Sequence, residues 1–141
     1  MFKKILIPVD GSENSFKAAK TAASMIANSD CLVTIFHVIE LPTIHSRPEF
    51  TQVLNLLKED IENEGKKIIE ISKSYFNNDK NLTSKITYGQ PASEIISESN
   101  KSNYDLIVLG SRGLGEFKGI MLGSVSDRVS HNAKASVLIV H

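Results

Sequence analysis

The sequence predicts a single α/β domain, residues 1–141, in which one five-stranded parallel sheet carries helices on both faces, a Rossmann-like arrangement. Short apolar runs rich in β-branched residues recur along the chain, the pattern of strands that are covered on both sides. Segments of helical periodicity separate these runs, so the order is βαβαβαβαβ. Parallel strands need long connections, which helices usually supply as right-handed crossovers.

The first half of the chain holds two predicted strands. Lys4–Val9 is the first apolar run, and Asp10–Ser12 interrupts it and offers a helix cap. The helix that follows is expected to end at Asn28–Asp30. Leu32–Ile39 is the second strand, and Leu41–Pro48 reads as an exposed loop with two prolines. The apolar face of the first helix comprises Phe16, Ala19, Ala22, Ala23 and Ile26.

A long helix is predicted next, ending at Asn77–Lys80, and it precedes a third strand. Its apolar residues keep the three-to-four spacing of one stripe, which we expect to face the sheet. Leu82–Tyr88 alternates like a strand with one exposed face, as at a sheet edge. The predicted stripe of the long helix comprises Phe50, Val53, Leu54, Leu57, Ile61, Ile68, Ile71 and Tyr75.

Two further strands complete the pattern. Pro91 suits the first turn of a short helix that ends near Asn100–Asn103. Asp105–Leu109 is the fourth strand, and Ser124–Asp127 matches the Ser-x-x-acid start of a helix. Val137–Val140 is the fifth strand.

Composition narrows the classes of partner. Sixteen basic residues balance sixteen acidic ones, which removes the electrostatic argument for nucleic acid or an anionic membrane as partner. The lone Cys31 forms no disulfide or cysteine metal site within one chain, consistent with a reducing, cytoplasmic location. Pro8, Asp10 and Gly11 interrupt the first apolar run far short of a signal peptide, and no run approaches transmembrane length.

The most informative segment runs from Gly110 to Ser124, as Gly110-x-x-Gly113, nine residues, then Gly123-Ser124. It lies at the carboxyl end of a buried strand, where open α/β sheets bind ligands. Gly110 and Gly113 are free to adopt positive φ and turn backbone N–H groups toward one point, and Ser124 offers a hydroxyl at a helix N-terminus. This arrangement suits a di- or triphosphate, although the same glycines can serve only as turn residues.

Three segments together resemble a known family. They are Ile5–Ser12, Phe36–Val38 and the glycine spacing just described. The chain resembles the universal stress proteins, in their ATP-binding branch, over nearly its whole length. The resemblance implies the sheet order 3-2-1-4-5, with Asp10 and Gly110 facing one crevice at the switch point. One departure is Ser136, where many relatives have proline, which leaves the conformation of the last strand open.

The resemblance also implies an ATP site, with AMP or ADP as other occupants. Val9 and Asp10, beside Pro8, match positions that line adenine and ribose, and the backbone of Val38 matches a contact to the adenine edge. A Mg²⁺ or Mn²⁺ ion would bridge phosphate oxygens, because Mg²⁺ prefers substrate phosphates and water to an all-protein cage, and Asp10 would help through water. The residues implied to hold the phosphates are Gly110, Arg112, Gly113, Gly123, Ser124, Val125 and Ser126.

The resemblance further implies a homodimer through the last strand. Val137–Val140 is apolar and would lie at the edge of the sheet, so pairing with a two-fold mate would satisfy its unpaired N–H and C=O groups.

Plainer interpretations exist for several of these residues. Asp10 can serve only as a helix cap, and Arg112 can be a solvated loop charge. His37, His45 and His131 have no ligand spacing on one helical face, so we interpret them as structural.

Three functional classes remain. We favour an ATP-binding stress-response or regulatory protein, in which bound nucleotide sets a conformation or an assembly with little or no turnover. A slow ATP hydrolase or phosphotransferase is the alternative, but no residue is marked as catalytic. A flavodoxin-like electron carrier needs its phosphate loop after the first strand, where only Gly11 and Ser12 stand. The downstream protein partner of a regulatory switch has no signature in the sequence.

Overall fold

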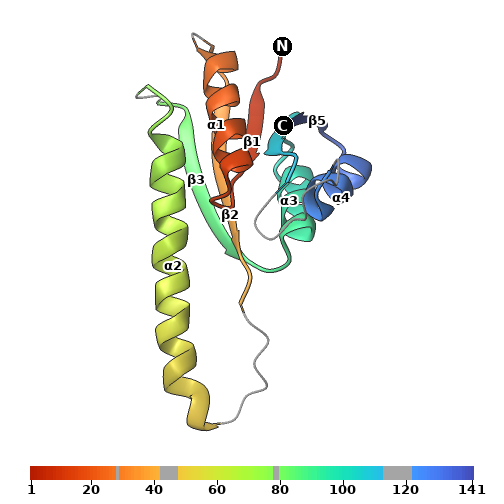
Figure 1. The fold of residues 1–141 in the computed structure, drawn as a ribbon. Coiled ribbons are helices and arrows are strands. Elements are labelled where there is room, and N and C mark those ends of the chain that lie inside the picture. The colour runs from red at the N-terminus through yellow and green to blue at the C-terminus, as the bar shows by residue number, and fades with distance from the viewer. Residues whose placement is uncertain (28, 42–47, 78–79, 113–121) are drawn as a thin grey trace.

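The computed structural model describes residues 1–27, 29–41, 48–77, 80–112 and 122–141. Strands and helices alternate along these residues, as predicted (Figure 1). None of the helices within these ranges is long and apolar enough to cross a membrane. The elements are β1 Lys4–Pro8, α1 Glu13–Ile26, β2 Leu32–Ile39, the short 3₁₀ helix η1 Pro48–Phe50, α2 Thr51–Lys73, β3 Leu82–Tyr88, α3 Pro91–Lys101, β4 Leu106–Gly110, α4 Ser124–Asn132 and β5 Ser136–Val140.

The five strands form one parallel sheet in the order β3-β2-β1-β4-β5, which confirms the predicted topology. Ile5 of β1 pairs with Val33 of β2 on one side and with Leu106 of β4 on the other. The chain therefore moves outward from β1 to β2 and β3, and then crosses to β4 on the opposite side. Beyond the carboxyl ends of β1 and β4 this reversal leaves the crevice in which such sheets bind ligands.

Helices cover the sheet on both faces, α1 and α2 on one and α3 and α4 on the other (Figure 1). Ile5 and Ile7 of β1 pack into the core under α1 and α2, while Leu6 packs into the core under α3. Successive side chains of a strand point to opposite faces, so a strand buried on both faces must be apolar at every position. This explains the continuous apolar run at the start of the chain.

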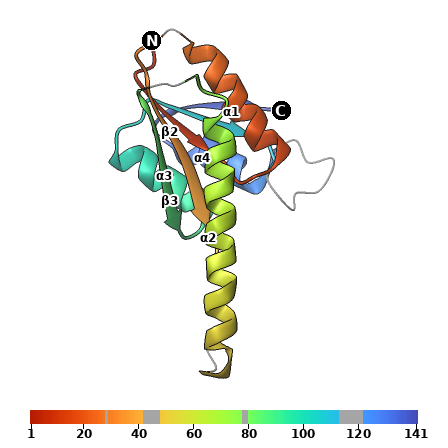
Figure 2. The same ribbon diagram turned by 90° about the vertical axis from the view of Figure 1, so that its left-hand side faces the viewer.

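Helix α2 corrects one prediction. Only its second half packs on the body, and its buried residues all lie between Gly65 and Ser72. The first half projects beyond the sheet (Figures 1 and 2), with Phe50, Val53 and Leu57 exposed at 45%, 52% and 40%. A helix of 23 residues is about 35 Å long. The eight residues of β2 span only about 26 Å, so the sheet is too short to cover the first half of the predicted stripe. Ile71 lies in the second half but is 45% exposed, so its place in the predicted stripe is wrong as well.

The helix starts are set by local hydrogen bonds. Ser12 caps α1, and its Oγ accepts from the N–H of Ser15 at 3.2 Å. α4 begins at Ser124, as predicted, but its N-cap is Gly123, so Ser124 does not cap the helix with its side chain. At the start of β5, the N–H of Ser136 donates to Asp105 O at 3.1 Å, a bond that proline would lack. The last strand therefore forms despite the departure from the family pattern at this position.

Candidate functional site

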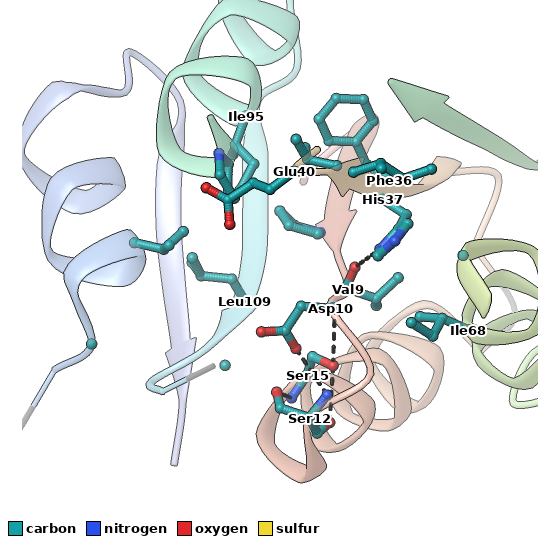
Figure 3. A pocket seen from close by; sticks show the side chains of 18 of the residues that line it. Val9, Asp10, Ser12, Ser15, Phe36, His37, Glu40, Ile68, Ile95 and Leu109 are labelled. Atoms are coloured by element: carbon teal, nitrogen blue, oxygen red, sulfur yellow. Dashed lines mark hydrogen bonds between the residues drawn. The ribbon is translucent and has the colours of Figure 1, made fainter. Parts of the chain in front are cut away.

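A pocket of about 450 Å³ opens at the carboxyl ends of the strands, at the switch point of the sheet (Figure 3). The ends of β1, β2 and β4 form its floor. The first turns of α1, α3 and α4 and one side of α2 form its walls. Three helix N-termini therefore meet at one cavity, where the helix dipoles favour negative charge. The starts of α1 and α3 are capped by the side chains of Ser12 and Gln90, whereas α4 has no side-chain cap.

The pocket brings together ten of the eleven predicted site residues. They come from four segments that lie far apart in the sequence, and the sheet order alone makes them neighbours. Gly113, the eleventh, lies outside the described residues. The ten are Pro8, Val9, Asp10, Val38, Gly110, Arg112, Gly123, Ser124, Val125 and Ser126.

One side of the pocket is polar and suits an anion. Helix α4 begins there, with Gly123 as its cap and Ser124 in its first turn. Ser126 Oγ lies 2.7 Å from Ser111 O, a hydrogen bond that fixes the start of the helix against the end of β4. Arg112 Nε is buried and has no hydrogen-bond partner among the described residues. A buried unpaired donor beside a helix N-terminus is the expected partner of a bound oxyanion.

Gly110 has a different role from the one predicted. Among the described glycines only Gly11 and Gly89 have positive φ, so the expected left-handed turn at Gly110 is wrong. A Cβ atom at Gly110 would lie 2.7 Å from the carbonyl carbon of Asn14. The glycine is therefore required because α1 starts directly against the end of β4.

Asp10 supports the turn between β1 and α1. Its Oδ1 accepts from the N–H of Ser12 at 2.9 Å, and Ser12 in turn caps α1. The carboxylate thus braces the helix start without being the N-cap itself, while it also lines the pocket (Figure 3).

The opposite side of the pocket is mainly apolar and is closed by α2. Ile61 and Ile68 of α2 lie opposite Val9 and Val38 at the strand ends. A flat aromatic ring system suits such walls, which exclude water and leave the strand-end backbone groups to bond the ring edge.

His37 holds this apolar side together and acts as a structural residue, in agreement with the prediction. Its buried Nδ1 lies 2.7 Å from Val9 O, so the ring donates this hydrogen bond. Gly65 of α2 packs against the same ring, and a Cβ there would lie 2.9 Å from His37 Cδ2. His131 is exposed on α4 and close to Asp127, whereas His45 lies outside the described residues.

Sequence reasoning missed the contributions of α2 and α3. Gly65 carried a signal, because glycine inside a helix costs about 1 kcal/mol and usually marks a close approach. The other lining residues carried no such signal in the sequence. The spacing of apolar residues along a helix shows which side of the helix is buried, but it does not show which strand ends that side faces. They include Glu40, Ile61, Glu64, Ile68, Gln90, Pro91 and Ile95. Among the described residues, no group of three or more His, Cys, Asp and Glu could hold a metal ion.

Comparisons of sequence and of structure with known proteins find the same family. The sequence model of the universal stress protein family matches residues 1–141. The universal stress protein YxiE of Bacillus subtilis is 34% identical, over 99% of each chain. The universal stress protein MJ0531 of Methanocaldococcus jannaschii is 33% identical, over 99% of this chain and 82% of its own. The structure of UspA from Lactobacillus plantarum superposes with a TM-score of 0.88 at 24% identity, covering 99% of this chain and 98% of that one.

Some solved structures of this fold contain an adenine nucleotide. A universal stress protein in complex with cAMP superposes with a TM-score of 0.67 at 24% identity, covering 99% of this chain and 97% of that one. The protein from Archaeoglobus fulgidus with dAMP has a TM-score of 0.68 at 16% identity, with 100% and 98% covered. A family member from Arabidopsis thaliana with AMP has a TM-score of 0.59 at 24% identity, with 98% and 90% covered. At these identities the likeness to this chain is one of fold.

Proposed function

Because the chain belongs to the universal stress protein family, we propose that it acts in the family's ATP-binding branch, as a cytoplasmic regulatory protein whose bound nucleotide sets a conformation or an assembly. The observation that carries this proposal is the buried Nε of Arg112, which has no hydrogen-bond partner among the residues that the structure describes and lines a pocket of about 450 Å³ together with the N-terminus of α4. That volume is within the range of small-molecule sites. The single cysteine, a buried thiol, suits a reducing compartment.

The residues present fit a nucleotide from end to end. The apolar walls of Val9, Val38 and Ile68 suit adenine, and Asp10 offers a carboxylate to ribose hydroxyls. Arg112 and the first turn of α4 offer a guanidinium, backbone N–H groups and the hydroxyl of Ser124 to phosphates. The hydroxyl of Ser126 donates its proton to Ser111 O instead, so Ser126 would contribute through its backbone. The similar folds that contain AMP, dAMP and cAMP support an adenine nucleotide as the ligand class.

We assign Mg²⁺ or Mn²⁺ to the phosphates rather than to the protein. The described residues contain no ready set of metal ligands, so the ion would be bound through phosphate oxygens and water. Asp10 is the carboxylate placed nearest the start of α1 and would reach the ion through water.

Binding with little or no turnover fits the site better than hydrolysis. A hydrolase needs a residue that orients the attacking water. Asp10 lines the pocket at the end of β1, but its carboxylate already accepts the Ser12 N–H that shapes the turn into α1. The slow hydrolase therefore gains no specific support from the geometry.

Calorimetry on nucleotide-free protein tests the proposal. ATP with Mg²⁺ should bind with micromolar affinity, on the order of −7 to −8 kcal/mol, because the phosphate contacts are largely backbone groups. Arg112→Ala should weaken binding by roughly 1.5–3 kcal/mol, and Gly123→Val, which places a side chain at the start of α4, should abolish it.

Lys134→Ala removes the same charge from an exposed position outside the pocket and is the matched control. No heat with ATP and metal, or equal loss in the Arg112 and Lys134 variants, would contradict the proposal.

We also propose that β5 pairs with its two-fold mate to form a homodimer. β5 is the last strand of the sheet, and its outer edge is unpaired within the described residues. Its side chains are only partly buried, so a second copy would cover apolar surface as well as pairing the edge.

A further inference from the structure

The last residues of β2 alternate in the direction of their backbone groups, and this alternation decides what Val38 presents to the pocket. In a parallel sheet, successive residues of an inner strand turn their N–H and C=O groups to one neighbouring strand and then to the other. Phe36 O accepts from the Val9 N–H at 2.8 Å, on the β1 side. Ile39 O accepts from the Gly89 N–H at 3.0 Å, on the β3 side. Val38 lies two residues after Phe36 and therefore directs its N–H and C=O toward β1.

Val38 finds no backbone partner on that side. One further step of the ladder would send the Val38 N–H to Val9 O and the Gly11 N–H to Val38 O. Neither hydrogen bond is present in the part of the chain that the structure describes. His37 Nδ1 lies 2.7 Å from Val9 O and donates to it instead (Figure 3). Gly11 has a φ of +87°, which turns the chain out of the strand.

The His37 ring thus takes the acceptor to which Val38 would otherwise donate. The ring is 8% exposed, and Gly65 of α2 packs closely against it, so its position is fixed. Backbone N–H and C=O groups without a partner are rare in folded proteins. Val38 lines the pocket, and unpaired backbone groups at a pocket wall are the kind that orient a bound small molecule.

An adjacent N–H and C=O from one residue match one edge of adenine. Adenine N1 accepts a hydrogen bond and the N6 amine beside it donates one. Hypoxanthine, the base of ITP, has the opposite pattern, because its N1 carries a proton and its O6 accepts. A site built from one fixed donor and one fixed acceptor therefore discriminates between the two bases.

We propose that His37 is a positioning residue for recognition of the base. By holding Val9 O, it keeps the backbone N–H of Val38 open for adenine N1. It acts through Val9 and Val38 rather than by a contact of its own with the base. The inference rests on the proposed nucleotide site, but the state of the Val38 amide can be measured without nucleotide.

Amide hydrogen exchange followed by NMR in nucleotide-free protein tests the effect of His37 on Val38. The Val38 amide should exchange rapidly in the wild type. His37→Leu removes the donor, so Val9 O should capture the Val38 N–H and slow its exchange by roughly tenfold, the effect of about one hydrogen bond.

His37→Asn is the matched control. Asparagine has nearly the shape of leucine, but its Nδ2 can donate from the place of the histidine Nδ1, so the Val38 amide should remain open. Both variants lose the ring that packs against Gly65. The Val9 amide, which donates to Phe36 O, is the internal reference and should stay protected in all three proteins.

Calorimetry with ATP and with ITP, each with Mg²⁺, tests the recognition of the base. The wild type should bind ATP at least about tenfold more tightly than ITP. His37→Leu should lose most of this preference, whereas His37→Asn should keep it. General loosening of the pocket would weaken both nucleotides alike and leave their ratio unchanged, so the ratio reports on positioning. Circular dichroism checks that both variants are folded.

A Val38 amide that is already protected in the wild type, or equally protected in His37→Leu and His37→Asn, would overturn the proposal. An equal ratio of ATP to ITP affinity in the two variants would overturn it as well. If the wild type bound neither nucleotide, the proposed function would fail, whereas the exchange experiment would still decide whether His37 keeps the Val38 amide open.

Discussion

At the residue scale, the site depends on two glycines that allow segments to approach closely. Gly110 lets the start of α1 lie against the end of β4, and Gly65 lets α2 lie against His37. Neither has the positive φ for which glycine is usually selected. Glycine is required at both positions because a Cβ atom would collide with a neighbouring segment. Substitution there therefore tests the packing around the pocket.

We expect Gly110→Ala to lower the free energy of unfolding by about 1–3 kcal/mol, since its Cβ would meet backbone atoms of Asn14 that cannot rotate away. Gly123→Ala is the control. Gly123 has φ −72° and ψ 162°, which any residue adopts, so its cost should stay near that of a changed N-cap, below about 1 kcal/mol. Urea unfolding measures both. If both substitutions lowered the free energy of unfolding equally, the close contact between Gly110 and Asn14 would not be the reason for the glycine.

A double-mutant cycle tests the contact between Gly65 and His37. Gly65→Ala should destabilise the wild type, because the new methyl group meets a ring that is held by its hydrogen bond to Val9 O. In a His37→Ala background the same change should stabilise by up to about 1 kcal/mol, because alanine is the better helix former. Thermal or urea unfolding of the four proteins measures the cycle. If Gly65→Ala changed the free energy of unfolding in the same direction in both backgrounds, the proposed contact with His37 would be contradicted.

At the element scale, α3 is fastened to β3 by a buried acid. Lys85 Nζ of β3 lies 2.6 Å from Glu98 Oε2 of α3, and the hydroxyl of Ser102 donates to Glu98 Oε1 at 3.0 Å. Burial acts to raise the pKa of Glu98, but these two hydrogen bonds and the neighbouring lysine charges outweigh it, so the pKa lies below its ordinary 4.5. The ionised form is therefore the one that holds α3 in place.

This depressed pKa predicts acid sensitivity of the element. The contribution of Glu98 to stability is fully present above its unfolded pKa, near 4.5, and is lost as pH falls through the lower pKa of the folded state. Urea unfolding between pH 6 and pH 3 should therefore show a shallower decline for Glu98→Gln than for the wild type. Glu94→Gln on the same helix is a control and should decline like the wild type. Parallel curves for all three proteins would refute the assignment.

At the scale of the whole molecule, β5 offers a test of the proposed dimer. The N–H of Ser136 and the C=O of Val140 bond toward β4. Because backbone groups alternate along a strand, Val137 and Ile139 direct theirs toward the outer edge. Proline is tolerated on an edge strand where its missing N–H would face outward.

We therefore expect Ile139→Pro to remove an outward N–H and convert the dimer to a monomer while the domain stays folded. Leu138→Pro removes an N–H that bonds to β4 and should unfold the strand instead. Light scattering at micromolar concentration and circular dichroism separate the two outcomes. A wild type that is monomeric at this concentration, or an Ile139→Pro variant that remains dimeric, would rule out pairing through β5.

The sequence by itself determined the elements and their order. Strands buried on both faces are mainly apolar, so Leu32–Ile39, with only Thr34 and His37 as polar residues, could be bounded to the residue from its apolar and β-branched pattern. The glycine pattern after β4 and the resemblance at Ile5–Ser12 led to ten residues that do share one pocket. Such signals depend on only a few neighbouring residues, so they can be recognised in the sequence before the fold is known.

Only the tertiary structure decided how far each surface is covered and what else closes the pocket. Periodicity showed which side of α2 is apolar, but the length of the sheet decides that Ile68 is buried while Leu57 is exposed. Likewise, position 110 must be glycine because the backbone of Asn14, which is remote in the sequence, leaves no room for a Cβ atom. Burial and close approach depend on the distance between segments, and that distance is a property of the assembled layers rather than of any one segment.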